Sequence, residues 1–169
     1  MVTLCSLGLM SNMRIGYGED IHRLVTGRKL MLAGVHVPFE RGEDAHSDGD
    51  VVYHALSDAL LGAIALGDIG QHFPDNAEHT KDMDSSLIVK GCYEMVVQQG
   101  FEVSNADITL ILEKPKIREY IQEMRRNIAK LLGISIDKVS IKAGTNEGLD
   151  AIGRGEAVKA IALVLVNER

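Results

Sequence analysis

One apolar run, Val51 to Leu66, constrains the fold more than any other part of the sequence. Its letters, VVYHALSDALLGAIAL, are apolar around most of a helical circumference, so we expect a helix that is buried on several sides. Such a helix needs a real hydrophobic core around it. A domain of about 150 residues buries roughly 70% of the surface that its unfolded chain exposes, and this chain of 169 residues is large enough.

The segments around this run predict both strands and helices. Apolar or alternating segments predict strands over 13–17, 101–112, 139–143 and 158–166, and 29–37 is a further apolar run. Helical spacing predicts further helices over 85–99 and 117–132. This order predicts one α+β domain over residues 13–169, with a mixed sheet of about four main strands covered on one face by helices. We expect residues 1–12 to be an N-terminal extension, disordered or non-native.

The composition argues against several classes of partner. A net charge of −6 disfavours a general binder of nucleic acids or anionic membranes, which would need a basic surface. Trp is absent and aromatic residues make up 4%, which disfavours base-stacking platforms. No apolar run reaches the roughly 20 residues that span a bilayer. Two cysteines cannot build a disulfide framework, so we expect a reducing compartment. Our expectation for the localisation is cytoplasmic, of bacterial type.

Three polar residues have the types and positions of metal ligands. Asp20 and His22 lie two apart in GEDIH, so an extended backbone points them the same way. His54 is an ionisable group inside the apolar run, where it is costly unless satisfied. Zinc accepts such ligands, and three protein ligands with one open position are typical of catalytic sites. Asp58, one turn later, is a candidate to orient the His54 ring; a chance D-x-H string and an ordinary core histidine stay open as alternatives.

Three loops carry further candidate groups. His46, in AHSDGD, precedes a helix N-terminus, where it can donate to a phosphate oxygen; a capping loop is the alternative for this string. In GTNEGLDAIGRGE, Thr145, Glu147 and Arg154 offer a hydroxyl, a carboxylate and a cation among glycines that let a backbone approach a ligand. A flexible hairpin is the alternative there. The KPK string at 114–116 fits either an anionic ligand or a solvated strand end.

Taken together, these strings resemble one family. RIGYGEDIH, AHSDGDVVYHALSDALLGAIALGDIG, HFPD, the EKPKI segment and GRGE are similar in content and order to the 2-C-methyl-D-erythritol 2,4-cyclodiphosphate synthases, enzymes of the non-mevalonate isoprenoid pathway. The resemblance extends from residue 13 to the C-terminus. It implies a homotrimer of α+β subunits with active sites between neighbouring subunits.

The resemblance also implies roles for particular residues. Zinc would bind Asp20, His22 and His54, and Glu147 would hold a second divalent cation, Mg²⁺ or Mn²⁺, through the diphosphate of the substrate. His46 and Thr145 would stabilise the transition state. The residues that the resemblance assigns to substrate binding are Ser47, Asp68, Ile69, Gly70, Phe73, Pro74, Asp75, Leu112, Lys116, Ile117, Arg118, Gly144, Asn146 and Arg154.

The implied reaction is an intramolecular phosphoryl transfer by a phosphorus–oxygen lyase. The 2-phosphate of 4-diphosphocytidyl-2-C-methyl-D-erythritol 2-phosphate attacks the β-phosphate, which gives 2-C-methyl-D-erythritol 2,4-cyclodiphosphate and CMP. Both reacting groups are anionic, so positioning and charge neutralisation are needed rather than a protein nucleophile. Two alternatives stay open: a zinc-dependent phosphohydrolase in which water attacks, and a trimeric binding protein with a structural zinc.

Three residues depart from the usual pattern of the family. Glu19 stands where many relatives have an aromatic or other uncharged residue, and if it faces the trimer axis, a pocket for an isoprenoid diphosphate there is in doubt. Ala77 stands where many members have an Asp, and Ala151 where some have an aromatic residue. None of the three is among the implied metal ligands.

Overall fold

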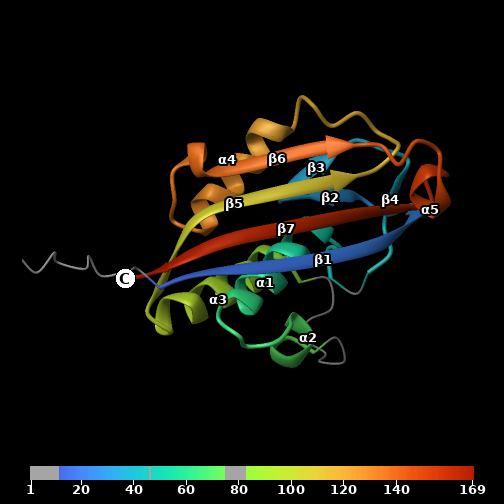
Figure 1. The fold of residues 1–169 in the computed structure, drawn as a ribbon. Coiled ribbons are helices and arrows are strands. Elements are labelled where there is room, and N and C mark those ends of the chain that lie inside the picture. The colour runs from blue at the N-terminus through green and yellow to red at the C-terminus, as the bar shows by residue number, and fades with distance from the viewer. Residues whose placement is uncertain (1–11, 46, 75–82) are drawn as a thin grey trace, which may run out of the picture.

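The fold is built on one long antiparallel pair of strands (Figure 1). The computed structural model describes residues 12–45, 47–74 and 83–169. The first strand, β1 (Met13–Thr26), and the last, β7 (Ala157–Glu168), lie side by side with Met13 opposite Asn167 and Arg23 opposite Ala157. The two ends of the domain therefore meet in the middle of one sheet.

Three more strands complete this sheet, whose order is β4-β1-β7-β5-β6. β5 (Phe101–Ile111) pairs antiparallel with β7 and parallel with β6 (Val139–Gly144), and the short β4 (Arg41–Glu43) forms the opposite edge. Two further strands, β2 (Leu30–Leu32) and β3 (Val35–Val37), form a separate hairpin. The prediction of a mixed sheet is confirmed, and β4 is a strand that the sequence pattern did not predict.

Helices cover one face of the sheet (Figure 1). The three longer helices are α1 (Val51–Ala63), α3 (Ser86–Gln98) and α4 (Ile121–Leu131), and the shorter ones are α2 (Ile69–His72), η2 (Ile136–Lys138) and α5 (Asp150–Gly153). Ten of the 13 residues of α1 are buried, because this helix packs on β1 and β7 and against α3. The expectation of a helix buried on several sides is confirmed. No helix in the described ranges is both long and apolar enough to span a bilayer.

One strand differs in extent from the sequence prediction, and one apolar run is divided between two strands. β1 continues to Thr26 rather than ending at Tyr17, because β7 and then β4 supply pairing partners along its whole length. The run 29–37 is not one strand. It folds back at Ala33 and Gly34, which both have positive φ angles, of 50° and 73°.

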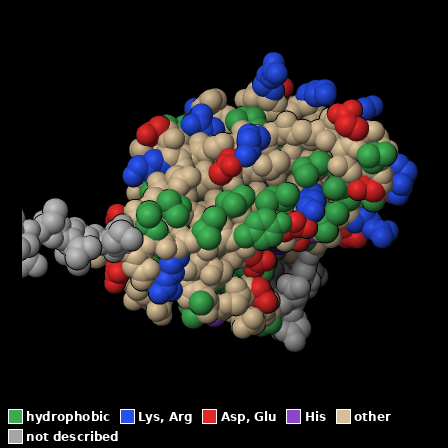
Figure 2. All heavy atoms as spheres, in the orientation of Figure 1, with side chains coloured by type: hydrophobic (Ala, Val, Ile, Leu, Met, Phe, Trp, Pro, Cys, Tyr) green, Lys and Arg blue, Asp and Glu red, His purple; other side chains and the backbone are tan. Residues whose placement is uncertain are grey.

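The other face of the sheet carries none of the described helices. Met13, Ile15, Tyr17 and Ile21 of β1 are more than half exposed. Figure 2 shows a band of hydrophobic side chains across this face. A contiguous apolar patch on a surface is typical of a site where another protein binds.

Candidate active site

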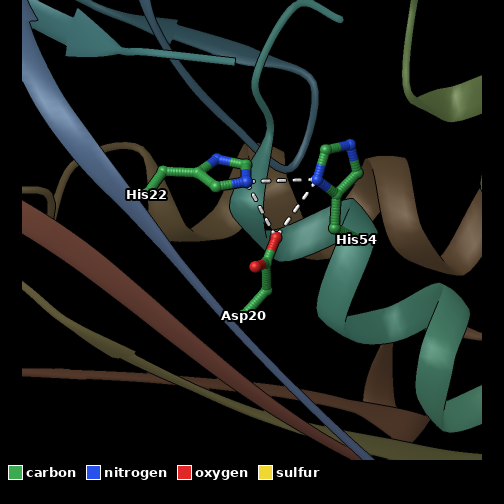
Figure 3. A group of neighbouring side chains, drawn as sticks. All are labelled: Asp20, His22 and His54. Atoms are coloured by element: carbon green, nitrogen blue, oxygen red, sulfur yellow. Dashed lines mark hydrogen bonds and ion pairs between the residues drawn. The ribbon is translucent and has the colours of Figure 1, made fainter. Parts of the chain in front are cut away.

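Three side chains from two elements meet at one end of the buried helix (Figure 3). Asp20 and His22 extend from β1 toward α1, and His54 extends from α1 toward them. Asp20 Oδ2 lies 2.9 Å from His22 Nε2 and 3.1 Å from His54 Nδ1, and the two ring nitrogens are 3.3 Å apart. A zinc ion about 2.0–2.1 Å from each atom in tetrahedral geometry would set these distances at roughly 3.3 Å. The three atoms therefore fit one small divalent cation.

Two glycines of β1 let α1 come close enough to deliver His54. A Cβ atom on Gly16 would lie 1.8 Å from the carbonyl oxygen of Ala59, and one on Gly18 would lie 2.0 Å from that of Ala55. Any other residue at either position would push the helix away from the strand, because the obstacle is helix backbone. The glycines of RIGYGEDIH thus set the separation between strand and helix on which the cluster depends.

The ring of His22 is oriented from behind by two acceptors. Its Nδ1 lies 2.7 Å from the carbonyl oxygen of Gly49 and 3.2 Å from Glu43 Oε2. Because both groups accept hydrogen bonds, Nδ1 carries a proton and donates it. The lone pair of neutral His22 is then on Nε2, the nitrogen that faces Asp20 and His54.

The ring of His54 is oriented by hydroxyl groups. Its Nε2 lies 3.1 Å from Ser85 Oγ and 3.3 Å from Ser47 Oγ. The Ser85 hydroxyl in turn donates to Asp48 Oδ1 at 2.6 Å, so a chain of hydrogen bonds runs from the ring to a carboxylate. Because Nε2 makes these contacts, Nδ1 of His54 faces Asp20 Oδ2 and His22 Nε2.

The prediction that Asp58 orients His54 was wrong. Asp58 Oδ1 accepts a hydrogen bond from the backbone N–H of Ile69 at 2.8 Å, which fixes the start of α2 instead. The residues that do support the rings, Glu43 and Ser85, were missed. Both are completely buried, but each stands in a polar stretch of sequence that gives no sign of burial.

Burial and mutual contacts shift the titration of the cluster. Burial raises the pKa of Asp20, but hydrogen bonds from His22 and His54 outweigh it and hold the pKa well below its usual range. Burial lowers the pKa of His22, but Asp20 and Glu43 outweigh it and raise the pKa to about 10. Burial raises the pKa of Glu43 to about 8, against the lowering effect of His22. A cation that binds Nε2 of His22 must therefore displace a proton at neutral pH.

The cluster lines a cavity of about 580 Å³. Five residues assigned to substrate binding line the same cavity, and these are Ser47, Asp68, Ile69, Gly70 and Phe73. Pro74 is exposed and is not among the lining residues. His46 and Asp75 lie outside the described residues.

A second cavity, of about 80 Å³, lies where β5 and β6 end. Its lining includes five more of the assigned residues, which are Leu112, Lys116, Ile117, Gly144 and Thr145. The described linings of the two cavities share no residue. Within one chain, the structure therefore places the group of Asp20, His22 and His54 and this second group of assigned residues in separate cavities.

The loop after β6 brings Thr145 and Glu147 together. The Thr145 hydroxyl donates to Glu147 Oε1 at 3.0 Å, and Glu113 Oε1 accepts the backbone N–H of Asn146 at 3.2 Å. Arg154 forms a two-point ion pair with Glu156, with nitrogen–oxygen distances of 3.0 and 3.1 Å. Arg118, Asn146, Glu147 and Arg154 line neither cavity as described.

The unusual Glu19 lies on the face of the sheet that the described helices leave uncovered. It accepts a hydrogen bond from the Tyr17 hydroxyl and forms an ion pair with Lys159 of β7, with a nitrogen–oxygen distance of 2.7 Å. A charged pair thus interrupts the hydrophobic band (Figure 2). Ala151 lies in α5, and Ala77 lies outside the described residues.

The fold and the site together define a class. Structural zinc sites are closed by four protein ligands, whereas catalytic sites have three and leave one position open. This small α+β domain has two histidines and one carboxylate at the wall of a cavity, which is typical of an enzyme that uses one divalent cation. No fourth His, Cys, Asp or Glu joins the group in the part of the chain that the structure describes.

Comparison with known proteins identifies the family. The chain belongs to the YgbB family, whose model matches residues 13–167. It is 52% identical over 157 residues to 2-C-methyl-D-erythritol 2,4-cyclodiphosphate synthase of Neisseria gonorrhoeae, which covers 93% of this chain and 98% of that protein. It is 49% identical over 156 residues to the synthase of Brachyspira hyodysenteriae, which covers 92% and 99%. The prediction that this chain is an enzyme of the synthase family is confirmed.

Solved structures share the fold. The bifunctional IspDF from Campylobacter jejuni matches with a TM-score of 0.90 and 38% identity, over 94% of this chain and 43% of that longer protein. IspF from Plasmodium falciparum in complex with CDP matches with a TM-score of 0.82 and 31% identity, over 93% and 97%. A 2C-methyl-D-erythritol-2,4-cyclodiphosphate synthase with CDP bound matches with a TM-score of 0.84 and 38% identity, over 90% and 99%.

Proposed function

We propose that this chain cyclises 4-diphosphocytidyl-2-C-methyl-D-erythritol 2-phosphate to 2-C-methyl-D-erythritol 2,4-cyclodiphosphate with release of CMP. The observation that carries the proposal is the cluster of Asp20, His22 and His54 in the wall of a cavity. Relatives of about half-identical sequence have this synthase name, and two similar structures hold CDP. A nucleotide diphosphate substrate is consistent with both.

We assign a zinc ion to Asp20 Oδ2, His22 Nε2 and His54 Nδ1. Their separations of 2.9–3.3 Å and their mixed nitrogen and oxygen chemistry support this assignment. When bound there, zinc supplies a Lewis acid for a phosphoryl oxygen. The protein holds both rings by hydrogen bonds from behind, so the ligand atoms stay aimed at one point.

The charge of the cavity supports a second cation. Besides Asp20, its described lining includes Asp44, Asp58 and Asp68, and it includes no Lys or Arg. A polyanionic substrate would be repelled by such walls unless cations accompany it. We therefore assign Mg²⁺ or Mn²⁺ to the diphosphate, held through Glu147, and expect Thr145 and His46 to donate hydrogen bonds to the charge that develops on the phosphoryl group.

We place the complete active site between two subunits of a homotrimer. In one chain, the metal cluster and the group around Lys116 and Thr145 line separate cavities. Contact between the cavity of one subunit and the smaller cavity of its neighbour would unite them. The exposed apolar side chains of β1 supply a surface for such contacts.

The composition of the chain indicates the kinds of partner that it binds. We expect a small-molecule substrate and copies of this chain, and neither nucleic acid nor membrane, because the net charge is −6. Cys92 is buried and free, which is consistent with a reducing compartment, and we place the enzyme in the cytoplasm.

The test is incubation of the purified protein with the proposed substrate. CMP and the cyclic diphosphate should appear together in equal amounts, and an Asp20→Asn variant should form neither at a comparable rate. Release of inorganic phosphate without the cyclic product would instead indicate a phosphohydrolase. Tight zinc binding without any turnover would indicate a binding protein with a structural ion.

A further inference from the structure

One buried carboxylate has no place in the reaction described above. Glu43 lies in the short edge strand β4, and its side chain is completely buried. Its Oε2 lies 3.2 Å from His22 Nδ1 and accepts the backbone N–H of Val51 at 3.1 Å. Its Oε1 has no hydrogen-bond partner. Among the hydrogen bonds and ion pairs of the described residues, His22 is the only side-chain partner of this carboxylate.

Such a group is costly to bury. An ionised carboxylate taken out of water loses far more free energy than one neutral partner returns, so buried carboxylates are usually paired with a cation or neutralised. A leucine or methionine would fill this site without that penalty. The position of Glu43 therefore calls for a positive charge at or near His22, either a proton on the ring or a cation bound to it.

The surrounding loop is shaped around Glu43. Gly49 has a φ of +83°, and a Cβ atom added to it would lie 2.8 Å from the Cβ atom of Glu43. The carbonyl oxygen of Gly49 accepts from the same His22 nitrogen at 2.7 Å. Glu43 and Gly49 thus both accept a hydrogen bond from Nδ1 of His22. The hydrogen bond from the Val51 N–H connects Glu43 to the start of α1.

We propose that Glu43 is a positioning residue of the cation site, which it serves through His22. Together with the Gly49 carbonyl, its carboxylate holds the ring with Nε2 toward Asp20 and His54. Its negative charge raises the affinity of that nitrogen for a divalent cation. The bound cation in turn compensates the buried charge. This inference rests on the proposed assignment of a cation to Asp20, His22 and His54.

The proposal predicts an effect that a purely structural role would not produce. If the cation and the carboxylate compensate each other, removal of the charge weakens cation binding but does not destabilise the cation-free protein. A residue that only fills space would destabilise both forms alike. Glu43→Gln keeps the size and removes the charge, and Glu43→Leu also removes the polar atoms. Glu40→Gln is a matched control, because its side chain is 76% exposed and only three residues away.

The experiment measures the affinity for zinc alone, by competition with a chromophoric chelator, and the melting temperature with and without zinc. We expect Glu43→Gln and Glu43→Leu to bind zinc about 10–100-fold more weakly than the unaltered protein. We expect Glu40→Gln to bind as the unaltered protein does. The rise in melting temperature on adding zinc should be smaller in both Glu43 variants, and the melting temperature of Glu43→Gln without zinc should not fall. Glu43→Leu should melt lower with and without zinc, because it also removes the acceptor of the Val51 N–H.

The outcomes separate this inference from the proposed function. If the unaltered protein does not bind zinc, the assignment of the cation site is wrong and the role of Glu43 is wrong with it. If the unaltered protein binds zinc and both Glu43 variants bind within about twofold of it, only the role of Glu43 is wrong. Equal losses of melting temperature with and without zinc in Glu43→Gln would also overturn that role, since they would indicate packing alone.

Discussion

Replacing Asp50 with alanine should lower the free energy of unfolding substantially, because its carboxylate closes two backbone turns at once. Oδ1 accepts the N–H groups of Ala33, Val52 and Tyr53 at 2.9, 3.1 and 3.2 Å, and Oδ2 accepts that of Gly34 at 2.6 Å. The side chain is completely buried. It caps the helix that carries the candidate metal ligand and ties this helix to the hairpin of β2 and β3.

The magnitude follows from these contacts. Loss of a helix N-cap costs about 1 kcal/mol, and each buried N–H left without a partner costs about 1–3 kcal/mol. Ala33 is buried and its N–H would be left unpaired, whereas Gly34 is exposed and water can replace the carboxylate there, so we expect Asp50→Ala to cost about 2–4 kcal/mol. Domains are stable by about 5–15 kcal/mol, so this loss is a large fraction of the total. Urea unfolding followed by circular dichroism measures it, with an expected fall in the midpoint of about 1–2 M.

Asp84 provides the control. Its Oδ1 accepts the N–H of Ser86 at 2.8 Å at the start of α3, but at an exposed site where water can replace the carboxylate. Asp84→Ala should therefore cost no more than about 1 kcal/mol. The reasoning is refuted if Asp50→Ala costs less than about 1 kcal/mol, or no more than Asp84→Ala does.

Four further changes test the site and the assembly. His54→Ala removes one of three ligand atoms, so zinc analysis should find well under one ion per chain and CMP release should fall roughly a hundredfold or more. Glu147→Gln should raise the Mg²⁺ or Mn²⁺ concentration for half-maximal activity, and an unchanged titration would remove Glu147 from this role. The pKa of His22 is raised to about 10 without metal, so protons compete with zinc for this ring. Zinc affinity should therefore rise roughly tenfold per pH unit between about pH 6 and 9. A zinc affinity that does not change with pH, measured by chelator competition, would contradict this. Ile15→Arg on the open sheet face should prevent the proposed trimer from forming, as measured by sedimentation, whereas Leu87→Arg on α3, also exposed, should not.

Local patterns in the sequence were sufficient to single out the three candidate metal ligands, which the structure brings together. The period of two places Asp20 and His22 on one face of a strand, and the cost of a histidine in an apolar helix singles out His54. These are properties of neighbours along the chain. The partners behind the rings depend instead on which distant loops pack together, so Glu43 and Ser85 had no local signature.

The length of β1 shows a second reason why the structure differs from the sequence prediction. The strand predicted over 13–17 contains Gly16 and stops before Gly18, because glycine weakens strands. In the fold both glycines lie inside β1 and admit the backbone of α1. The roles of Thr145 and Glu147 follow from family resemblance rather than from any pattern. Their loop lines no part of the large cavity in the described chain, so one subunit does not bring them to the metal cluster.

The central claim is that a phosphate of the substrate, rather than water, attacks the diphosphate. Turnover in water enriched in ¹⁸O, followed by mass spectrometry of the products, tests this claim most directly. Intramolecular attack predicts that neither CMP nor the cyclic diphosphate gains an oxygen atom from the solvent. One ¹⁸O atom in CMP, in a linear diphosphate or in inorganic phosphate would show that water is the nucleophile and would contradict the proposed function.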